Sequence, residues 1–152
     1  MIYKEEVRDL FSVPDEYYLA HCISADFGMG KGIVVEFNKR FNMKNRLIKM
    51  FDGDVTHAWD GNGKQGHPQG VCFKVDKVLN LITKRNYWLK PTYKTLTEAL
   101  ISMSEICMDY NITKIAMPII GCGLDRLQWN KVSEIIKDVF SNTDIEILVC
   151  KQ

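Results

Sequence analysis

The chain contains 152 residues, of which 46% are hydrophobic and 26% charged, as expected for one globular domain (residues 1–152) with a core of its own. Its formal charge of +1 argues against a broad basic surface for nucleic acid, although a local basic patch stays open. No apolar run approaches the length of a membrane span, and a strand-like pattern begins directly after Met1. We therefore expect no signal peptide and no membrane anchor.

The cysteines are odd in number, widely spaced and free of any Cys-x-x-Cys pair. This pattern is typical of reduced, mostly buried thiols and predicts a cytoplasmic or nuclear protein. No histidine has the spacing to the cysteines that a zinc site requires, so we expect neither a metal nor a cofactor. The residues concerned are Cys22, Cys72, Cys107, Cys122, Cys150, His21, His57 and His67.

The first part of the chain predicts two strands and a helix. Residues 2–7 alternate weakly in polarity, which indicates an edge strand. After a turn around Pro14, residues 17–23 are almost continuously apolar, as in a strand buried on both faces. Residues 24–32 are rich in glycine, and residues 33–41 have the apolar spacing of a helix. A glycine-rich loop is therefore predicted between a buried strand and a helix.

The next stretch combines a short helix with a less regular segment. Residues 43–51 predict the helix. Residues 52–70 are rich in glycine and polar residues, which predicts an irregular, mobile surface loop. His57 and His67 lie in this loop, where solvated residues are more common than active-site groups carried on a lid.

The second half alternates strands and helices. Residues 71–75 and 78–83 predict a hairpin. Pro91 and Thr92 then precede a long helix, whose apolar stripe is typical of core packing and not of a cofactor site. That stripe consists of Leu96, Leu100, Met103, Cys107 and Tyr110.

The C-terminal part repeats the arrangement of the first. A strand at residues 113–117 leads into a second glycine-rich loop, which is followed by a helix at 129–140 and a strand at 145–149. This alternation predicts an α/β sandwich with a mixed central sheet. Ligands bind such sheets beyond the carboxyl ends of the strands, where both glycine-rich loops are predicted to lie.

The second loop, residues 118–124, contains a Gly-x-Gly pair and is followed by Asp125. Glycine permits a positive φ and close backbone approach, so such a loop can direct N–H groups at an anion. The sequence lacks the Gly-x-x-x-x-Gly-Lys-Ser/Thr motif of an NTPase and the Gly-x-Gly-x-x-Gly motif of dinucleotide-dependent hydride transfer. A diphosphate held mainly by backbone N–H groups is an attractive hypothesis, because it needs little positive side-chain charge.

Three polar residues are candidates for specific roles. Asp9 follows a strand and is a candidate acceptor for an adenine amino group, or equally a turn or cap carboxylate. Lys84 ends an apolar strand. There, desolvation would lower its pKa and free a lone pair for attack on a sugar carbon, although lysines at strand ends are more often solvated. Asp125 is a candidate proton-transfer partner, or a carboxylate that interacts with the dipole of the following helix.

Six segments together resemble the macrodomain family, and more narrowly its terminal ADP-ribose protein glycohydrolase branch. The resemblance covers nearly the whole chain. The segments are Asp9-Leu10-Phe11, His21-Cys22-Ile23-Ser24, Gly28-Met29-Gly30-Lys31-Gly32-Ile33, Leu81-Ile82-Thr83-Lys84, Lys90-Pro91-Thr92-Tyr93 and Ile120-Gly121-Cys122-Gly123-Leu124-Asp125-Arg126-Leu127-Gln128-Trp129.

The resemblance implies a three-layer α/β/α sandwich that binds ADP-ribose. Asp9 would recognise the adenine, residues 28–33 would flank the distal ribose, and residues 119–124 would cradle the diphosphate. The ligand-binding residues implied are Asp9, Leu10, Ser24, Gly28, Met29, Gly30, Gly32, Ile33, Pro118, Ile119, Ile120, Gly121, Cys122, Gly123 and Leu124.

The resemblance also implies a hydrolase that removes ADP-ribose from acceptors such as glutamate or aspartate esters, with modified guanine and O-acyl-ADP-ribose as related substrates. Lys84 would attack the anomeric carbon of the distal ribose and form a lysyl-ADP-ribose adduct through the opened sugar, while Asp125 would shuttle protons. The implied partners are ADP-ribose and ADP-ribosylated protein, or ADP-ribosylated nucleic acid, and we expect a monomer. A non-catalytic ADP-ribose reader and an ADP-ribose 1″-phosphate phosphatase are the alternatives.

Three features depart from the family pattern. Arg8 stands where the family usually has a glycine, which predicts a different turn before Asp9. Residues 52–70 form a longer and more glycine-rich segment, which would change substrate choice if it folded over the ligand. The polar C-terminal residues Lys151 and Gln152 stand where an apolar end is usual.

Overall fold

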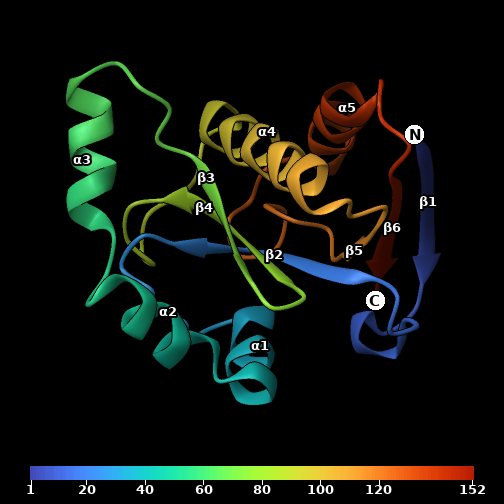
Figure 1. Ribbon diagram of the computed structural model, residues 1–152, viewed down its shortest axis with the longest axis horizontal. Coiled ribbons are helices and arrows are strands. Elements are labelled where there is room, and N and C mark those ends of the chain that lie inside the picture. Colours follow the sequence, from blue (N-terminus) through green and yellow to red (C-terminus); the bar gives the residue numbers. More distant parts are fainter.

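The computed structural model describes residues Met1–Gln152. Its centre is a six-stranded sheet with the order β1-β6-β5-β2-β4-β3 (Figure 1). Neighbouring strands are parallel except β3 and β4, so the predicted mixed sheet is confirmed. The strands are β1 (Ile2–Val7), β2 (Tyr18–Ser24), β3 (Val71–Val75), β4 (Val78–Lys84), β5 (Lys114–Met117) and β6 (Glu146–Lys151).

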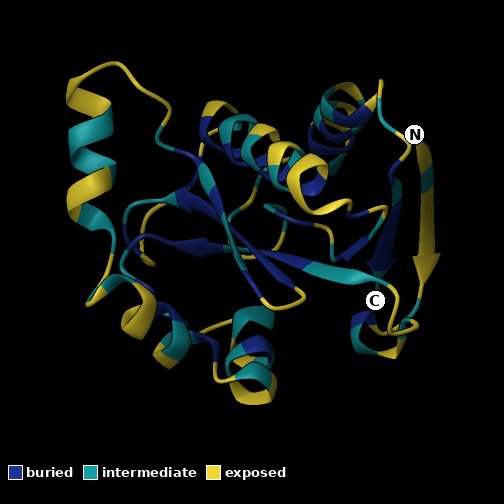
Figure 2. Cartoon of the chain, viewed as in Figure 1, coloured by how far each residue is buried: buried dark blue, intermediate teal, exposed yellow.

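Helices cover both faces of the sheet. They are the 3-10 helix η1 (Leu10–Ser12), α1 (Ile33–Phe41), α2 (Met43–Phe51), α3 (Thr56–Lys64), α4 (Tyr93–Tyr110) and α5 (Trp129–Phe140). One apolar cluster joins α4 and α5 to the sheet, and a second joins α1 and α2 to its other face. Figure 2 shows the strands between these helices as largely buried. The predicted three-layer α/β/α sandwich is confirmed.

Local sequence patterns predicted most of these elements to within two residues of their observed bounds. The bounds of α1, α2 and α5 agree with the predicted ones, because each helix has a strong apolar face. Helix α4 begins at a capping box, in which the Thr92 hydroxyl accepts from Thr95 N at 3.0 Å and the Thr95 hydroxyl accepts from Thr92 N at 3.1 Å. β1 pairs only with β6 and is largely exposed, which explains its weak pattern.

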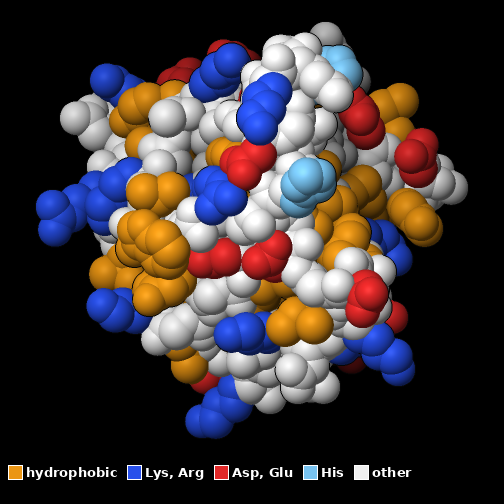
Figure 3. Space-filling view, turned by 90° about the vertical axis from the view of Figure 1, so that its left-hand side faces the viewer, with side chains coloured by type: hydrophobic (Ala, Val, Ile, Leu, Met, Phe, Trp, Pro, Cys, Tyr) orange, Lys and Arg blue, Asp and Glu red, His pale blue; other side chains and the backbone are white.

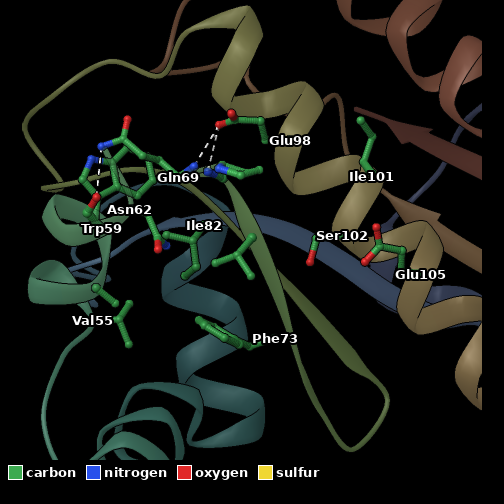
Figure 4. A pocket seen from close by; sticks show the side chains of 14 residues that line it. Val55, Trp59, Asn62, Gln69, Phe73, Ile82, Glu98, Ile101, Ser102 and Glu105 are labelled. Carbon is green, nitrogen blue, oxygen red and sulfur yellow. Dashed lines mark hydrogen bonds between the residues drawn. The ribbon is translucent and has the colours of Figure 1, made fainter. Parts of the chain in front are cut away.

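The expectation of an irregular loop over residues 52–70 is wrong for residues 56–64, which form helix α3. The helix contains Gly61 and Gly63, which each cost roughly 1 kcal/mol of helix propensity and weaken the local signal. Contacts from outside hold α3 in place: the Gln69 side chain donates to Trp59 O at 3.0 Å (Figure 4), and Asp60 pairs with Arg85. Tertiary interactions thus specify a helix that local propensity does not.

A pocket of about 320 Å³ lies between α3, β3 and α4 (Figure 4). On its α4 side, the Glu98 carboxylate accepts from Gln69 N and Gly70 N, both at 3.1 Å, and the Ser102 hydroxyl accepts from Cys72 N at 2.9 Å. These side chains satisfy N–H groups at the outer edge of β3, which would otherwise be open for pairing. None of the predicted site residues lines this pocket.

Gly70 lies where α4 approaches the start of β3 most closely. A Cβ at this position would lie 2.0 Å from Thr95 O and 2.8 Å from Ala99 N, both backbone atoms. We expect Gly70→Ala to lower the free energy of unfolding by about 2–3 kcal/mol, because the helix must move away from the sheet. Denaturant unfolding measures the change. Gly61→Ala is the control: with no atom within 4 Å of its Cβ, we expect it to stabilise the protein by about 1 kcal/mol through helix propensity.

None of the helices combines the length and apolar character needed to cross a membrane. All the cysteines are free thiols, and Cys72, Cys107 and Cys150 are buried.

Candidate active site

The predicted site residues lie at one edge of the sheet. β1, β6, β5, β2 and β4 run parallel, so their carboxyl ends meet at this edge. Asp9 follows β1, residues 118–128 follow β5, residues 25–32 follow β2, and Lys84 is the last residue of β4. The two glycine-rich loops therefore lie side by side, with Lys84 at one end of the edge and Asp9 at the other.

Lys84 and Asp125 form an ion pair at this edge, with Nζ and Oδ1 2.5 Å apart. Their side chains are only 13% and 15% exposed. Lys84 is therefore not a solvated surface lysine, and Asp125 lies outside the first turn of α5, which contains no acidic residue. The structure brings the two predicted catalytic groups together from positions 41 residues apart. At this distance Asp125 can accept a proton from Lys84 and return it.

The loop of residues 118–128 presents backbone donors. Gly121 has a φ of 73°, a conformation that favours glycine, and its carbonyl accepts from Leu127 N at 2.7 Å. This reversal leaves several N–H groups without a protein acceptor, as in backbone sites that bind anions. They belong to Ile119, Gly121, Gly123, Leu124 and Asp125.

The loop after β2 also presents backbone N–H groups that have no protein acceptor. Gly32, with a φ of 76°, is the N-cap of α1 and leaves the first turn of the helix without a side-chain cap. The N–H groups of residues 29–34 have no protein acceptor. Leu124 lies 3.5 Å from a Cβ placed at Gly32, so the two loops approach each other here. Together they form an edge of free N–H groups that suits a diphosphate.

Three predicted ligand residues have side chains that are part of the core, so only their backbone groups are available to a ligand. These are Leu10, Met29 and Ile120. The Ser24 hydroxyl is also buried, and it donates to the Asp26 carboxylate. The side chains of Ile119 and Leu124, in contrast, are exposed beside the loop.

Asp26 is a supporting residue that sequence reasoning missed. Its carboxylate accepts from Gly28 N at 3.0 Å, from Tyr87 N at 3.1 Å and from the Asn86 amide at 3.4 Å. Burial opposes its ionisation, but hydrogen bonds led by the one from Ser24 outweigh burial and hold the pKa of Asp26 below its usual value. The Asp-x-Gly turn was visible in the sequence. Its link to the segment after Lys84 was not.

Lys90 and Tyr93 support the other loop, again without a predicted role. Lys90 Nζ donates to Leu124 O at 2.5 Å, and the Tyr93 hydroxyl accepts from Gln128 N at 3.0 Å. Both residues belong to a segment that carried the family resemblance. No signal in that segment identifies the main-chain groups that they hold.

Asp9 occupies the far end of the edge. It is the N-cap of η1, and its Oδ1 accepts from Phe11 N at 3.0 Å, so the cap alternative is correct for this oxygen. Oδ2 has no protein donor and remains available. Arg8 precedes Asp9, and its guanidinium donates to Ser12 O at 3.1 Å. Four strand spacings of about 4.8 Å separate β1 from β4, so the edge extends roughly 19 Å.

The thiols near the ion pair are not candidates for nucleophiles. Burial, with a smaller contribution from the negative charge of Asp125, raises the pKa of Cys122 to about 11. Burial also raises the pKa of Cys22. Both residues stay neutral, so neither thiol competes with Lys84, the predicted nucleophile.

The fold and this arrangement of loops define a macrodomain. The macrodomain of Mycobacterium tuberculosis DarG superposes with a TM-score of 0.73 at 22% identity, over 98% of this chain and 97% of that one. Thermosipho africanus DarTG, solved in complex with ADP-ribose, superposes with a TM-score of 0.67 at 19% identity, over 94% of this chain and 39% of that one. At such identities the likeness establishes the fold alone. No family model matches the sequence.

Sequence relatives narrow the assignment. Human ADP-ribose glycohydrolase OARD1 is 41% identical over 141 residues, which cover 93% of this chain and 86% of the human protein. The bovine protein of the same name matches equally well. A DNA ADP-ribosyl glycohydrolase of Mycobacterium tuberculosis is 25% identical over 132 residues, 80% of this chain and 34% of that protein. The chain therefore belongs to the macrodomain family, in the branch of the human ADP-ribose glycohydrolase, and the predicted resemblance is confirmed.

Proposed function

We propose that this protein is a hydrolase that removes ADP-ribose from ADP-ribosylated acceptors, principally glutamate and aspartate esters of proteins. The observation that carries the proposal is the 2.5 Å ion pair of Lys84 and Asp125 beside two loops with free backbone donors. The names of the relatives, ADP-ribose glycohydrolase and DNA ADP-ribosyl glycohydrolase, support the same class of reaction.

Each group of the site has a role in the binding of ADP-ribose. The free N–H groups of residues 119–125 suit the diphosphate, and those of residues 29–34 suit the hydroxyls and phosphate oxygens next to the distal ribose. The free carboxylate oxygen of Asp9, at the β1 end of the edge, suits the adenine amino group. This orientation places the anomeric carbon of the distal ribose at the β4 end, beside Lys84.

Catalysis begins when Asp125 accepts a proton from Lys84. The Nζ lone pair then forms a bond to the anomeric carbon, and the bond from this carbon to the acceptor oxygen breaks. The acceptor leaves as a carboxylate with the bonding electrons. Asp125 next gives its proton to the ring oxygen and accepts another from Nζ, and the Nζ lone pair then forms a protonated imine with the sugar carbon as the bond from this carbon to the ring oxygen breaks. Water adds to that carbon, the C–N bond breaks, and free ADP-ribose and the lysine amine are restored.

Hydride trapping tests this mechanism on the unmodified protein. An ADP-ribosyl-glutamate peptide is added together with cyanoborohydride, which reduces the imine to a stable amine, and the protein is digested and analysed by mass spectrometry. We expect the ADP-ribose adduct on Lys84, and none on Lys64, an exposed lysine at the end of α3 that serves as an internal control. Release of ADP-ribose without an adduct on Lys84 would contradict the covalent mechanism. Binding of ADP-ribose without any release would identify a reader instead.

Two further proposals concern the assembly and the location of the protein. We propose that it acts as a monomer, because one chain supplies both catalytic groups and both loops. We also propose a reducing compartment, cytoplasmic or nuclear, because the cysteines are all free and largely buried. Size-exclusion chromatography with light scattering measures the oligomeric state.

A further inference from the structure

An exposed aromatic segment directly follows the catalytic strand. Tyr87, Trp88 and Leu89 are 54%, 64% and 42% exposed, and the rings of Tyr87 and Trp88 meet edge to face with centroids 5.0 Å apart. Single exposed apolar residues are ordinary, but three in a row beside a site mark an interaction surface. Figure 3 looks onto the end of the molecule to which β2 and β4 point, and shows hydrophobic side chains gathered there among lysines and arginines. We call residues 87–89 the aromatic strip.

Both candidate binding loops hold the base of the strip. Asp26, in the loop after β2, accepts from Tyr87 N at 3.1 Å, and a Cβ at Gly28 would lie 2.6 Å from the Tyr87 ring. At the other end of the strip, Lys90 donates to Leu124 O in the loop after β5. These contacts fix the backbone of the strip while its side chains stay accessible. The strip is therefore part of the rim of the site.

The position of the strip matches the path of the acceptor. ADP-ribose, as oriented above, extends across the sheet from Asp9 at β1 and ends at Lys84 on β4. The acceptor is bonded to the carbon that Lys84 attacks. The rest of the acceptor must therefore leave the site past the segment that follows Lys84, and the strip begins three residues further on.

The charges of this segment favour a polypeptide over a nucleic acid. Arg85 forms an ion pair with Asp60, with two N–O distances of 2.8 Å, and Lys84 forms one with Asp125. Lys90 is engaged with a carbonyl. The cations of this segment are thus all engaged within the protein and not free to contact a phosphate backbone, and the net charge of the chain is only +1. Tyrosine and tryptophan, in contrast, are the residues that dominate binding energy in protein interfaces.

We propose that the aromatic strip binds the polypeptide around the modified carboxylate and selects segments with an apolar side chain next to the modified glutamate or aspartate. This inference rests on the proposed function and names its acceptor. It makes Trp88, the most exposed residue of the strip, a determinant of specificity that acts on the acceptor and not on the ADP-ribose.

The test compares three substrates: two ADP-ribosyl-glutamate peptides that differ only in a leucine or a serine next to the modified residue, and O-acetyl-ADP-ribose, which lacks a peptide. We expect the wild-type protein to have a kcat/KM about tenfold higher for the leucine peptide than for the serine peptide. In Trp88→Ala this ratio should fall to near one. The kcat/KM for the leucine peptide, divided by the kcat/KM for O-acetyl-ADP-ribose, should fall about tenfold relative to the wild-type protein. Tyr110→Ala, which removes an exposed aromatic at the end of α4, should keep the wild-type ratios.

A binding measurement makes the inference independent of turnover. In Lys84→Ala protein, calorimetry should show tighter binding of the leucine peptide than of free ADP-ribose, and Trp88→Ala should remove the difference. If Trp88→Ala lowered kcat/KM equally for all three substrates, or kept the wild-type preference for the leucine peptide, the inference would be overturned. An ADP-ribosylated single-stranded oligonucleotide serves as a further substrate, since bases stack on exposed aromatics. If Trp88→Ala lowered kcat/KM for this oligonucleotide alone, the inference would also be overturned. If the wild-type protein released ADP-ribose from none of the substrates, the proposed function would be refuted. The calorimetric comparison would still show whether the aromatic strip binds the peptide.

Discussion

Replacing Lys84 with alanine is expected to lower the rate of ADP-ribose release by more than about 10³-fold, the order of loss seen when a covalent nucleophile is removed. The variant has no amine at the β4 end of the site, so no bond to the anomeric carbon can form. ADP-ribose binding should remain measurable by calorimetry, because the loops that suit the diphosphate do not contain Lys84. Release from an ADP-ribosyl-glutamate peptide, followed by chromatography, measures the rate.

Lys84→Arg separates the nucleophile from its charge. A guanidinium preserves the ion pair with Asp125 but stays protonated and cannot attack carbon. This variant should therefore be as inactive as Lys84→Ala, whereas Lys64→Ala, at an exposed site on α3, should have the wild-type rate. If Lys84→Arg retained activity, Lys84 would act through its charge, and Asp125 would have to activate water directly.

The elements that sequence predicted well are those whose pattern is local. The faces of α1, α2 and α5 repeat with the helical period, and in the hairpin of β3 and β4 the polar pair Asp76-Lys77 separates two apolar runs. Helix α3 has no such local pattern. Its glycines weaken the local preference, and its position depends on Gln69 and Arg85, which lie outside the helix. No window of sequence around residues 56–64 contains that information.

The site was predictable to the extent that parallel strands bring their carboxyl ends together. That rule located both glycine-rich loops and the end of β4 at one edge. It did not predict the distance between Lys84 and Asp125, which depends on how the loop of residues 118–128 folds back. It also gave no role to Asp26 or Lys90, because their partners are main-chain groups of distant segments.

A buried histidine makes the stability of the fold depend on pH. His21, on β2, is 0% exposed, stacks on Phe37 at 3.8 Å between ring centroids, and shares a 2.6 Å hydrogen bond between Nε2 and Asn80 Oδ1. Its Nδ1 has no partner. Burial, only partly opposed by the Asn80 hydrogen bond, lowers the pKa of His21 from 6.5 to about 4. The native state therefore holds a neutral imidazole where the unfolded chain is free to bind a proton.

The free energy of unfolding should consequently fall as the pH is lowered through 6.5, because the unfolded state gains a proton that the native state does not. The loss should reach roughly 2 kcal/mol between pH 7.5 and pH 5, approach about 3 kcal/mol near pH 4, and then level off for this group. Asp26, whose pKa is held below its usual 3.8, adds its own loss only at still lower pH. Urea unfolding at a series of pH values measures the slope between pH 7.5 and 5.

His21→Gln tests the assignment, since the glutamine amide can donate to Asn80 but does not titrate. This variant should be less stable at pH 7.5 because it loses the stack on Phe37, yet its free energy of unfolding should change little between pH 7.5 and 5. His57→Gln, on exposed α3, should retain the full wild-type slope. An unchanged slope in His21→Gln would show that another group binds the proton. A wild-type protein with no slope in this range would show that the core accommodates a charged imidazole, which an unpartnered Nδ1 among apolar neighbours argues against.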